Sequence, residues 1–123
     1  MNSVILQGSG IDKVVDAAEV FQLPAPEFRV DNVRTTCVLY GQRSFARMSR
    51  EDRIRACYQH ACLRYVLRDT MSNQSLRNRF GLPDERAETV SRILRDTLDA
   101  RLVKLEDPAS GSKKYARYVP FWA

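Results

Sequence analysis

The side chains that could carry chemistry are few and widely spaced. Cys57, His60 and Cys62 have the residue types of a metal site. On a helix the two cysteines, five residues apart, do not converge well, and a structural zinc site normally has four ligands. We therefore expect two buried thiols and a surface histidine. With this single histidine and no evident carboxylate pair, no set of nucleophile, base and orienting group stands out, so we expect no enzymatic activity.

A short glycine pair near the start could instead bind a ligand. Gly8 and Gly10 flank Ser9 just before a helical pattern. Backbone amides at the start of a helix can hold phosphate, but turn geometry alone also explains this pair. Both interpretations stay open at this point.

A pair of helices offers the clearest binding chemistry. A short helix from residue 72, a turn at Gly81 and a longer helix over residues 84–101 have the order of a helix-turn-helix. In that motif the second helix enters the major groove and its first half reaches base edges. We expect three outward-facing side chains on that half to do so: Arg86, Thr89 and Arg92.

Two flanking segments could hold the DNA backbone. The start of the shorter helix presents amides and the positive end of its dipole to phosphate. Its candidate residues are Ser72, Asn73 and Gln74, with Ser75 beside them. A β-hairpin wing over residues 103–119 would grip a flanking phosphate or the minor groove through Lys113, Lys114 and Arg117.

The charge of the longer helix favours a different use. Residues 84–101 carry four arginines against five carboxylates, whereas a helix lying in DNA usually has a more basic face. The same three-helix unit could therefore be a protein-interaction or dimerisation module. Salt-dependent affinity for duplex DNA would support the first interpretation.

Composition is compatible with either interpretation. The chain has 123 residues, a net charge of +5 and a pI near 9.4, which permits a polyanionic partner without demanding one. Three cysteines form no disulfide framework. No signal peptide and no apolar run of about 20 residues is visible. We expect a soluble, cytoplasmic protein with no membrane contact and no cofactor of its own.

Residues 1–47 indicate a helix followed by a β-hairpin. Apolar side chains recur on one helical face at Ile11, Val14, Val15, Ala18 and Phe21. Strand patterns follow over residues 27–30 and 34–40, with turn chemistry between them. One helix on a two-stranded ribbon is marginally stable alone. This segment is therefore expected to be the remnant of an upstream domain.

Residues 48–123 are expected to form the second unit. Ser49 and Asp52 resemble a capping box before a helix over residues 50–69, and Ser72 caps the next helix. The longer helix should bury a stripe of Ala87, Val90, Leu94 and Leu98, with Ile93 and Thr97 at its edges. The aromatic end, residues 120–122, should dock on the body.

Three strings in this region resemble a known family. They are SNQSLRNRFGLP, VSRILRDTLDARLVK and DPASGSKKYARYVPFWA. They resemble the C-terminal winged-helix tail of bacterial proteins classed as transcriptional regulators, which carry an N-terminal Schlafen/AlbA-type domain and are often described as RecG-helicase-related. The segment GSGIDKVV, with LPAPEF after it, is similar to the end of a degenerate histidine-kinase-type ATPase domain.

The resemblance implies an α+β fold: a winged helix-turn-helix, three helices plus a β-hairpin wing, preceded by a helix and β-hairpin remnant of an ATPase-like domain. It implies DNA-linked regulation, with residues 86, 89 and 92 as positions of the recognition helix. It implies duplex DNA and upstream domains as partners. A homodimer is a further expected partner, since DNA-binding winged helices often pair on half-sites. A third hypothesis is that residues 8–13 contact nucleotide in a complete protein. No Walker loop supports a helicase activity in this chain.

Overall fold

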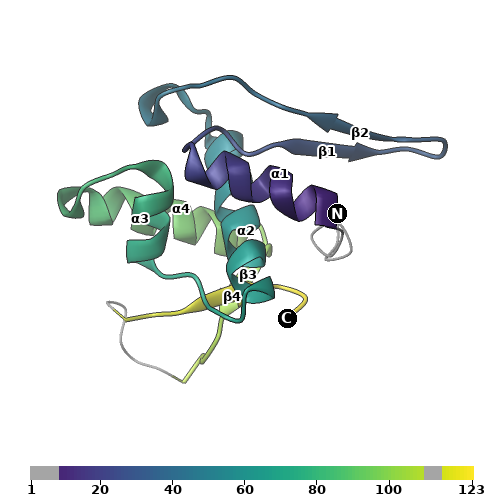
Figure 1. Cartoon of the computed structure of the whole chain (residues 1–123). Helices are drawn as coiled ribbons and strands as arrows, with labels where there is room; N and C mark the ends of the chain where they lie inside the picture. Colours follow the sequence, from purple (N-terminus) through teal and green to yellow (C-terminus); the bar gives the residue numbers. More distant parts are fainter. Residues whose placement is uncertain (1–8, 110–114) are drawn as a thin grey trace.

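The computed structural model describes residues 9–109 and 115–123. Within them the chain folds as α+β, with four α-helices and two small antiparallel hairpins. Helix α2 lies at the centre, with α1 across one side, α3 and α4 on another and the β3–β4 hairpin at its end (Figure 1). No helix in the described part is long and apolar enough to cross a membrane.

Helix α1 (Ser9–Val20) packs on α2; its Val15 and Ala18 are buried, and Val15 belongs to the core cluster. The expectation that Phe21 shares this apolar face is wrong, because its side chain is 68% exposed. The helix ends at Val20, and Gln22 takes a left-handed conformation with φ 53°. The chain turns away before Phe21 can reach the core.

The first hairpin pairs β1 (Glu27–Val30) with β2 (Thr35–Val38) in antiparallel register, Val30 opposite Thr35. Asp31 closes the turn, because its Oδ1 accepts the amide hydrogens of Val33 and Arg34, both at 2.8 Å. This hairpin agrees with the predicted one. Figure 1 shows it extending away from the helices.

Helix α2 (Arg50–Val66) begins at the predicted capping box. Ser49 Oγ accepts the Asp52 amide at 3.0 Å, and Asp52 Oδ2 accepts the Ser49 amide at 3.2 Å. Burial opposes ionisation of Asp52, but hydrogen bonds from Ser49 and Arg55 outweigh it and hold the pKa of this carboxyl below its ordinary value. A short 3-10 turn, Phe45–Arg47, precedes the helix and was not predicted.

Helix α3 (Asn73–Phe80) ends at Gly81, which has φ 68°. A left-handed residue after a helix is the usual role of glycine. The longer predicted helix begins as a 3-10 turn, η3 (Asp84–Arg86), and continues as α4 (Ala87–Asp99). Three apolar side chains and Thr97 are buried along α4: Val90, Ile93 and Leu94.

The second hairpin pairs β3 (Val103–Leu105) with β4 (Tyr118–Pro120). Met71, between α2 and α3, adds a bridge: its amide donates to Tyr118 O at 3.1 Å and its carbonyl accepts from Tyr118 N at 2.8 Å. The expected docking of the aromatic end is confirmed. Trp122 Nε1 donates to the Tyr58 hydroxyl at 3.1 Å, and Phe121 stacks on the same ring.

Residues on both sides of the expected boundary after residue 47 contribute to one hydrophobic core. Val15 and Ala25 lie in the same buried cluster as Cys57 and Leu94. Polar side chains of α2 and α3 reach carbonyls of the connection after α1: Arg55 Nε to Ala25 (3.1 Å), Gln59 Nε2 to Pro26 (2.6 Å) and Arg79 Nη2 to Leu23 (2.6 Å).

Candidate nucleic-acid interface

The start of α3 is built by a second capping box. Ser72 Oγ accepts the Ser75 amide at 3.1 Å, and Ser75 Oγ accepts the Ser72 amide at 3.0 Å. The helix's own ladder leaves its first amides unused, and Ser72 satisfies that of Ser75. The amides of Asn73 and Gln74 therefore remain for a ligand, at the positive end of the helix dipole.

These residues open on a hollow of about 510 Å³. It lies between the start of α3, the start of α4 and the segment that leads into β4. Four of the predicted residues line it: Ser72, Asn73, Gln74 and Arg117. The pattern of the sequence did not indicate the others: Arg77, Asp84, Ala87, Ser91 and Tyr115.

Asn73 serves the protein rather than a ligand. Its Nδ2 donates to Ala87 O at 2.9 Å and to Ser91 Oγ at 3.0 Å, and its Oδ1 accepts from Arg77. Arg77 also lies 3.6 Å from Asp84. The Asn73 amide thereby fixes α3 against α4. The exposed residues that line the hollow are Gln74, Asp84, Ser91, Tyr115 and Arg117.

The predicted recognition residues lie apart from this hollow. Thr89 and Arg92 line a second hollow of about 250 Å³ beside the start of α2. Arg86 donates through Nε to Thr89 Oγ1 at 3.2 Å, and its guanidinium lies 6.0 Å from the Phe45 ring. Arg86 therefore lies beside Thr89, and Thr89 and Arg92 line the side of α4 that faces the start of α2.

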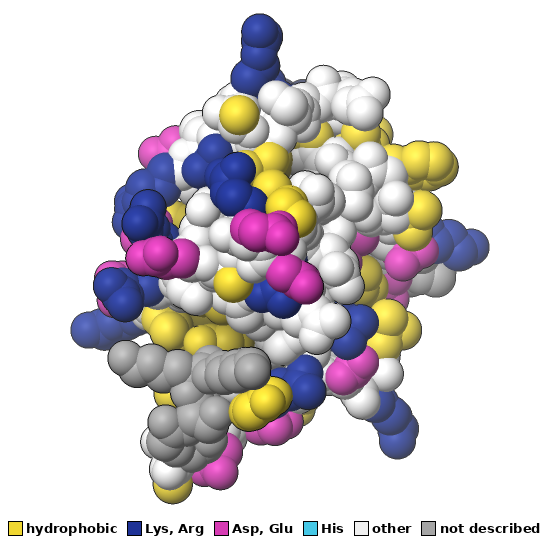
Figure 2. Space-filling model, turned by 90° about the vertical axis from the view of Figure 1, so that its left-hand side faces the viewer, with side chains coloured by type: hydrophobic (Ala, Val, Ile, Leu, Met, Phe, Trp, Pro, Cys, Tyr) yellow, Lys and Arg dark blue, Asp and Glu magenta, His cyan; other side chains and the backbone are white. Residues whose placement is uncertain are grey.

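The charges on α4 are largely paired. Arg92 lies 3.6 Å from Glu88, and Arg50 of α2 lies 3.2 Å from Asp96. Figure 2 shows basic and acidic side chains interspersed over the face that is on the left in Figure 1. Such a surface has a weak net field, which favours a contact with mixed charges over one with bare phosphate.

Lys113 and Lys114 of the expected wing, together with Gly8, lie outside the described residues. Arg117 is described and is exposed. It is the one predicted wing cation that the structure places beside the α3 start.

The prediction of a surface histidine is wrong. His60 is 4% exposed and bridges three helices. Its Nδ1 lies 2.8 Å from Glu19 Oε1 of α1, and its Nε2 lies 2.9 Å from Ser75 Oγ of α3. Arg79 Nε lies 3.3 Å from Glu19 Oε2, close enough for an ion pair although not aligned as a hydrogen bond. Burial lowers the pKa of Arg79 despite that carboxylate.

This chain of serine, histidine and carboxylate has the connectivity of an acyl-transfer relay, but its surroundings indicate structure. Ser75 Oγ also accepts the Ser72 amide in the capping box. Arg79 neutralises the carboxylate, and the imidazole is buried. The cluster joins α1 to α2 and to the start of α3.

The cysteines behave as predicted for buried thiols. Burial raises the pKa of Cys57 to about 12 and that of Cys62 to about 11. The raised pKa values disfavour the thiolate, which is the nucleophilic form of cysteine, and both thiols are buried. Within the described ranges no three potential metal-binding side chains come together.

Comparisons with models of protein families, with curated proteins and with solved structures find no match to this chain.

Proposed function

We propose that this chain is a winged helix-turn-helix that binds duplex DNA as part of a transcriptional regulator. The observation that carries the proposal is the hollow in which the start of α3, the start of α4 and Arg117 meet. Its lining combines the first turn of α3, at the positive end of the helix dipole, with the exposed Arg117, beside the Asp84 carboxylate that lies near Arg77. First-turn amides and a guanidinium are groups that proteins use to hold a DNA phosphate.

The arrangement of elements supports the winged-helix interpretation. Helices α2, α3 and α4 precede the β3–β4 hairpin, and α3 is joined to α4 through the left-handed Gly81. The bridge between Met71 and Tyr118 holds the hairpin against the helices. A wing fixed in this way can contact DNA beside the helix that enters the groove.

In this proposal α4 enters the major groove while α3 and the wing hold the backbone. Arg86 and Arg92 would exchange their present partners for bases or phosphates. The ion pair between Arg92 and Glu88 is highly exposed, and such pairs contribute at most about 1 kcal/mol. That pairing therefore costs little to break on binding DNA.

The protein is proposed to bind without catalysis, in the cytoplasm, and with upstream domains of a longer protein. The family resemblance supports this placement through three strings that span α3, α4 and the C-terminal strand. A homodimer would place two α4 helices on successive half-sites about one helical turn of DNA apart.

A second function is favoured by the charges of α4. Alternating basic and acidic side chains suit a protein partner better than a polyanion. Under this alternative the same face forms a dimer or docks on an upstream domain. Gel shifts with random duplex over a range of salt concentrations, beside sedimentation of the free protein, separate the two.

Retarded DNA whose fraction falls as salt rises supports DNA binding. Undetectable binding at low salt, with Lys113/Lys114→Ala changing nothing, eliminates it. A concentration-dependent dimer without DNA binding would select the interaction module.

A further inference from the structure

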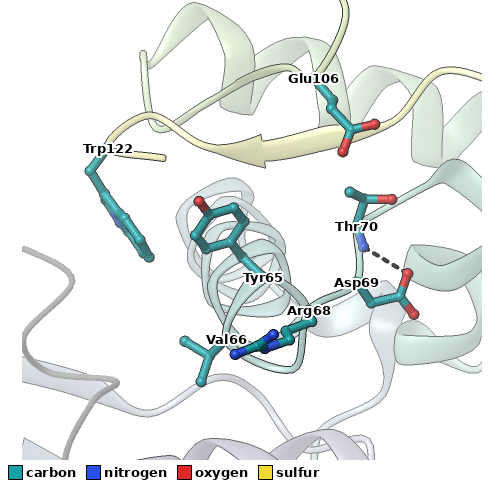
Figure 3. Close-up of a pocket in the computed structure, with 7 residues that line it drawn as sticks. All are labelled: Tyr65, Val66, Arg68, Asp69, Thr70, Glu106 and Trp122. Carbon is teal, nitrogen blue, oxygen red and sulfur yellow. Dashed lines mark hydrogen bonds between the residues drawn. The ribbon is translucent and has the colours of Figure 1, made fainter.

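A separate hollow of about 750 Å³ lies at the end of α2, between that helix and the aromatic C-terminal segment. Its lining comes from the end of α2, the segment that follows it, and the β3–β4 region: Tyr65, Val66, Arg68, Asp69, Thr70, Glu106 and Trp122. Figure 3 shows these side chains. None of them lines the hollow at the start of α3.

Two aromatic rings form one corner of this hollow. Tyr65 and Trp122 meet at nearly a right angle, 88°, with ring centroids 5.4 Å apart. The hydrogen bond from Trp122 Nε1 to the Tyr58 hydroxyl, 3.1 Å long, fixes the indole. Tyr65 is 41% exposed. A fixed, accessible pair of rings can bind a cation through the negative faces of the π-systems.

Two carboxylates also line the hollow, and only one of them is free to pair with a ligand. Asp69 is engaged: its Oδ2 accepts from Arg64 Nη2 at 2.5 Å and its Oδ1 from the Thr70 amide at 2.7 Å. Glu106 is exposed and makes no ion pair with any described residue. In Figure 3 its carboxylate lies on one side of Tyr65 and the Trp122 ring on the other.

One cation of the protein, Arg68, lines the same hollow. It is exposed and holds a left-handed backbone conformation, φ 62°, after the end of α2. The hollow thus combines aromatic rings and two carboxylates with one arginine, in a chain whose net charge is +5. Because Arg64 pairs with Asp69, Glu106 is the lining carboxylate that is left for an added cation.

We propose that this hollow binds an arginine side chain of a partner polypeptide. A guanidinium can donate to the Glu106 carboxylate while its plane and methylene groups pack on the Tyr65 and Trp122 rings. An anionic ligand would meet Arg68 but also both carboxylates. The side chains proposed to contact DNA do not line this hollow, although Glu106 lies in the same 103–119 hairpin region as Arg117.

The test uses the single tryptophan of the chain, which lies in the site. Trp122 fluorescence is titrated with N-acetylarginine amide, and in parallel with N-acetylcitrulline amide, its neutral isostere. We expect a saturable change with arginine, with Kd on the order of millimolar for so small a ligand, and no saturable change with citrulline. An equal response to both ligands, or none to arginine, overturns the proposal.

Two charge variants should shift the arginine affinity in opposite directions. Glu106→Gln should weaken it roughly three- to fivefold, because the carboxylate that pairs with the guanidinium is lost. Arg68→Asn should strengthen it, because a competing cation is removed and asparagine tolerates positive φ. Glu85→Gln, an exposed carboxylate outside the hollow, is the control and should change nothing. If neither the Glu106 nor the Arg68 variant changes the arginine affinity, or if Glu85→Gln does change it, the assignment is overturned.

Discussion

Replacing Gly81 by alanine tests how the α3–α4 turn is held. Gly81 has φ 68°, a conformation that costs a residue with a Cβ about 1–2 kcal/mol. An added Cβ would also lie 2.7 Å from Oε1 of Gln22, so that side chain must move. Moving it breaks the bond from Gln22 Nε2 to Asn78 O, 3.1 Å long, which adds about 0.5–1.5 kcal/mol. We expect Gly81→Ala to cost about 2–3 kcal/mol of unfolding free energy.

Urea denaturation followed by far-UV circular dichroism measures this free energy, and the melting temperature should fall by roughly 10 °C. Gly41→Ala is the matched control, since a Cβ there meets nothing within 4 Å. In a Gln22→Ala background the cost of Gly81→Ala should drop to the backbone share, about 1–2 kcal/mol. A Gly81→Ala cost equal to that of Gly41→Ala would refute the left-handed turn. An unchanged cost in the Gln22→Ala background would refute the contact between the two segments.

Three further outcomes are expected. Glu19→Gln should lower the unfolding free energy by about 3 kcal/mol, because it leaves Arg79 buried beside a neutral group. Glu51→Gln, at an exposed carboxylate, is the control. Equal losses of stability in the two variants would contradict the buried cluster. Because its folded pKa is depressed, the stability that Asp52 contributes is present above its ordinary pKa and disappears as pH falls through the folded pKa. Asp52→Asn should therefore reduce the fall in the urea midpoint that accompanies acidification below about pH 4. An unchanged fall would contradict a contribution of Asp52 to this pH dependence. A thiol reagent should label one of three cysteines in the native protein, Cys37, and all three in denaturant; rapid native labelling of more than one is the contrary result.

Local rules predicted the helix boundaries well. Ser49 and Ser72 both cap helices, and Gly81 takes the left-handed conformation expected after α3. These features depend on residues only a few positions apart, so residue type and spacing are enough to predict them. The Asp31 turn between β1 and β2 has the same local origin.

Long-range partners could not be predicted in the same way. His60 was expected at the surface because a polar residue usually faces outward, yet its partner Glu19 lies 41 residues away. No helical pattern indicates that a carboxylate from α1 will meet it. Phe21 fits the apolar face of α1 by spacing, but the left-handed Gln22 ends the helical path first.

The sequence named candidate DNA-contacting residues but could not say which of them lie close together. Ser72, Gln74 and Arg117 do line one hollow, whereas Thr89 and Arg92 line another beside α2. The division follows from which face of α4 is buried on α2 and α3, and residue spacing along one helix does not contain that information. Ser91 and Arg77 line the first hollow because of the same packing of α4 against α3, which the sequence pattern does not reveal.

The most direct measurement of the proposed function is the salt dependence of duplex DNA binding by the native protein and Arg117→Ala. Fluorescence anisotropy of a labelled random duplex gives the slope of log K against log salt concentration. The proposal predicts a negative slope, smaller in magnitude by about one unit in Arg117→Ala. Arg34→Ala removes the same charge from the exposed turn of the β1–β2 hairpin and should leave the slope unchanged. An unmeasurable affinity at low salt, or equal slopes for the native protein and Arg117→Ala, would contradict DNA binding through this surface.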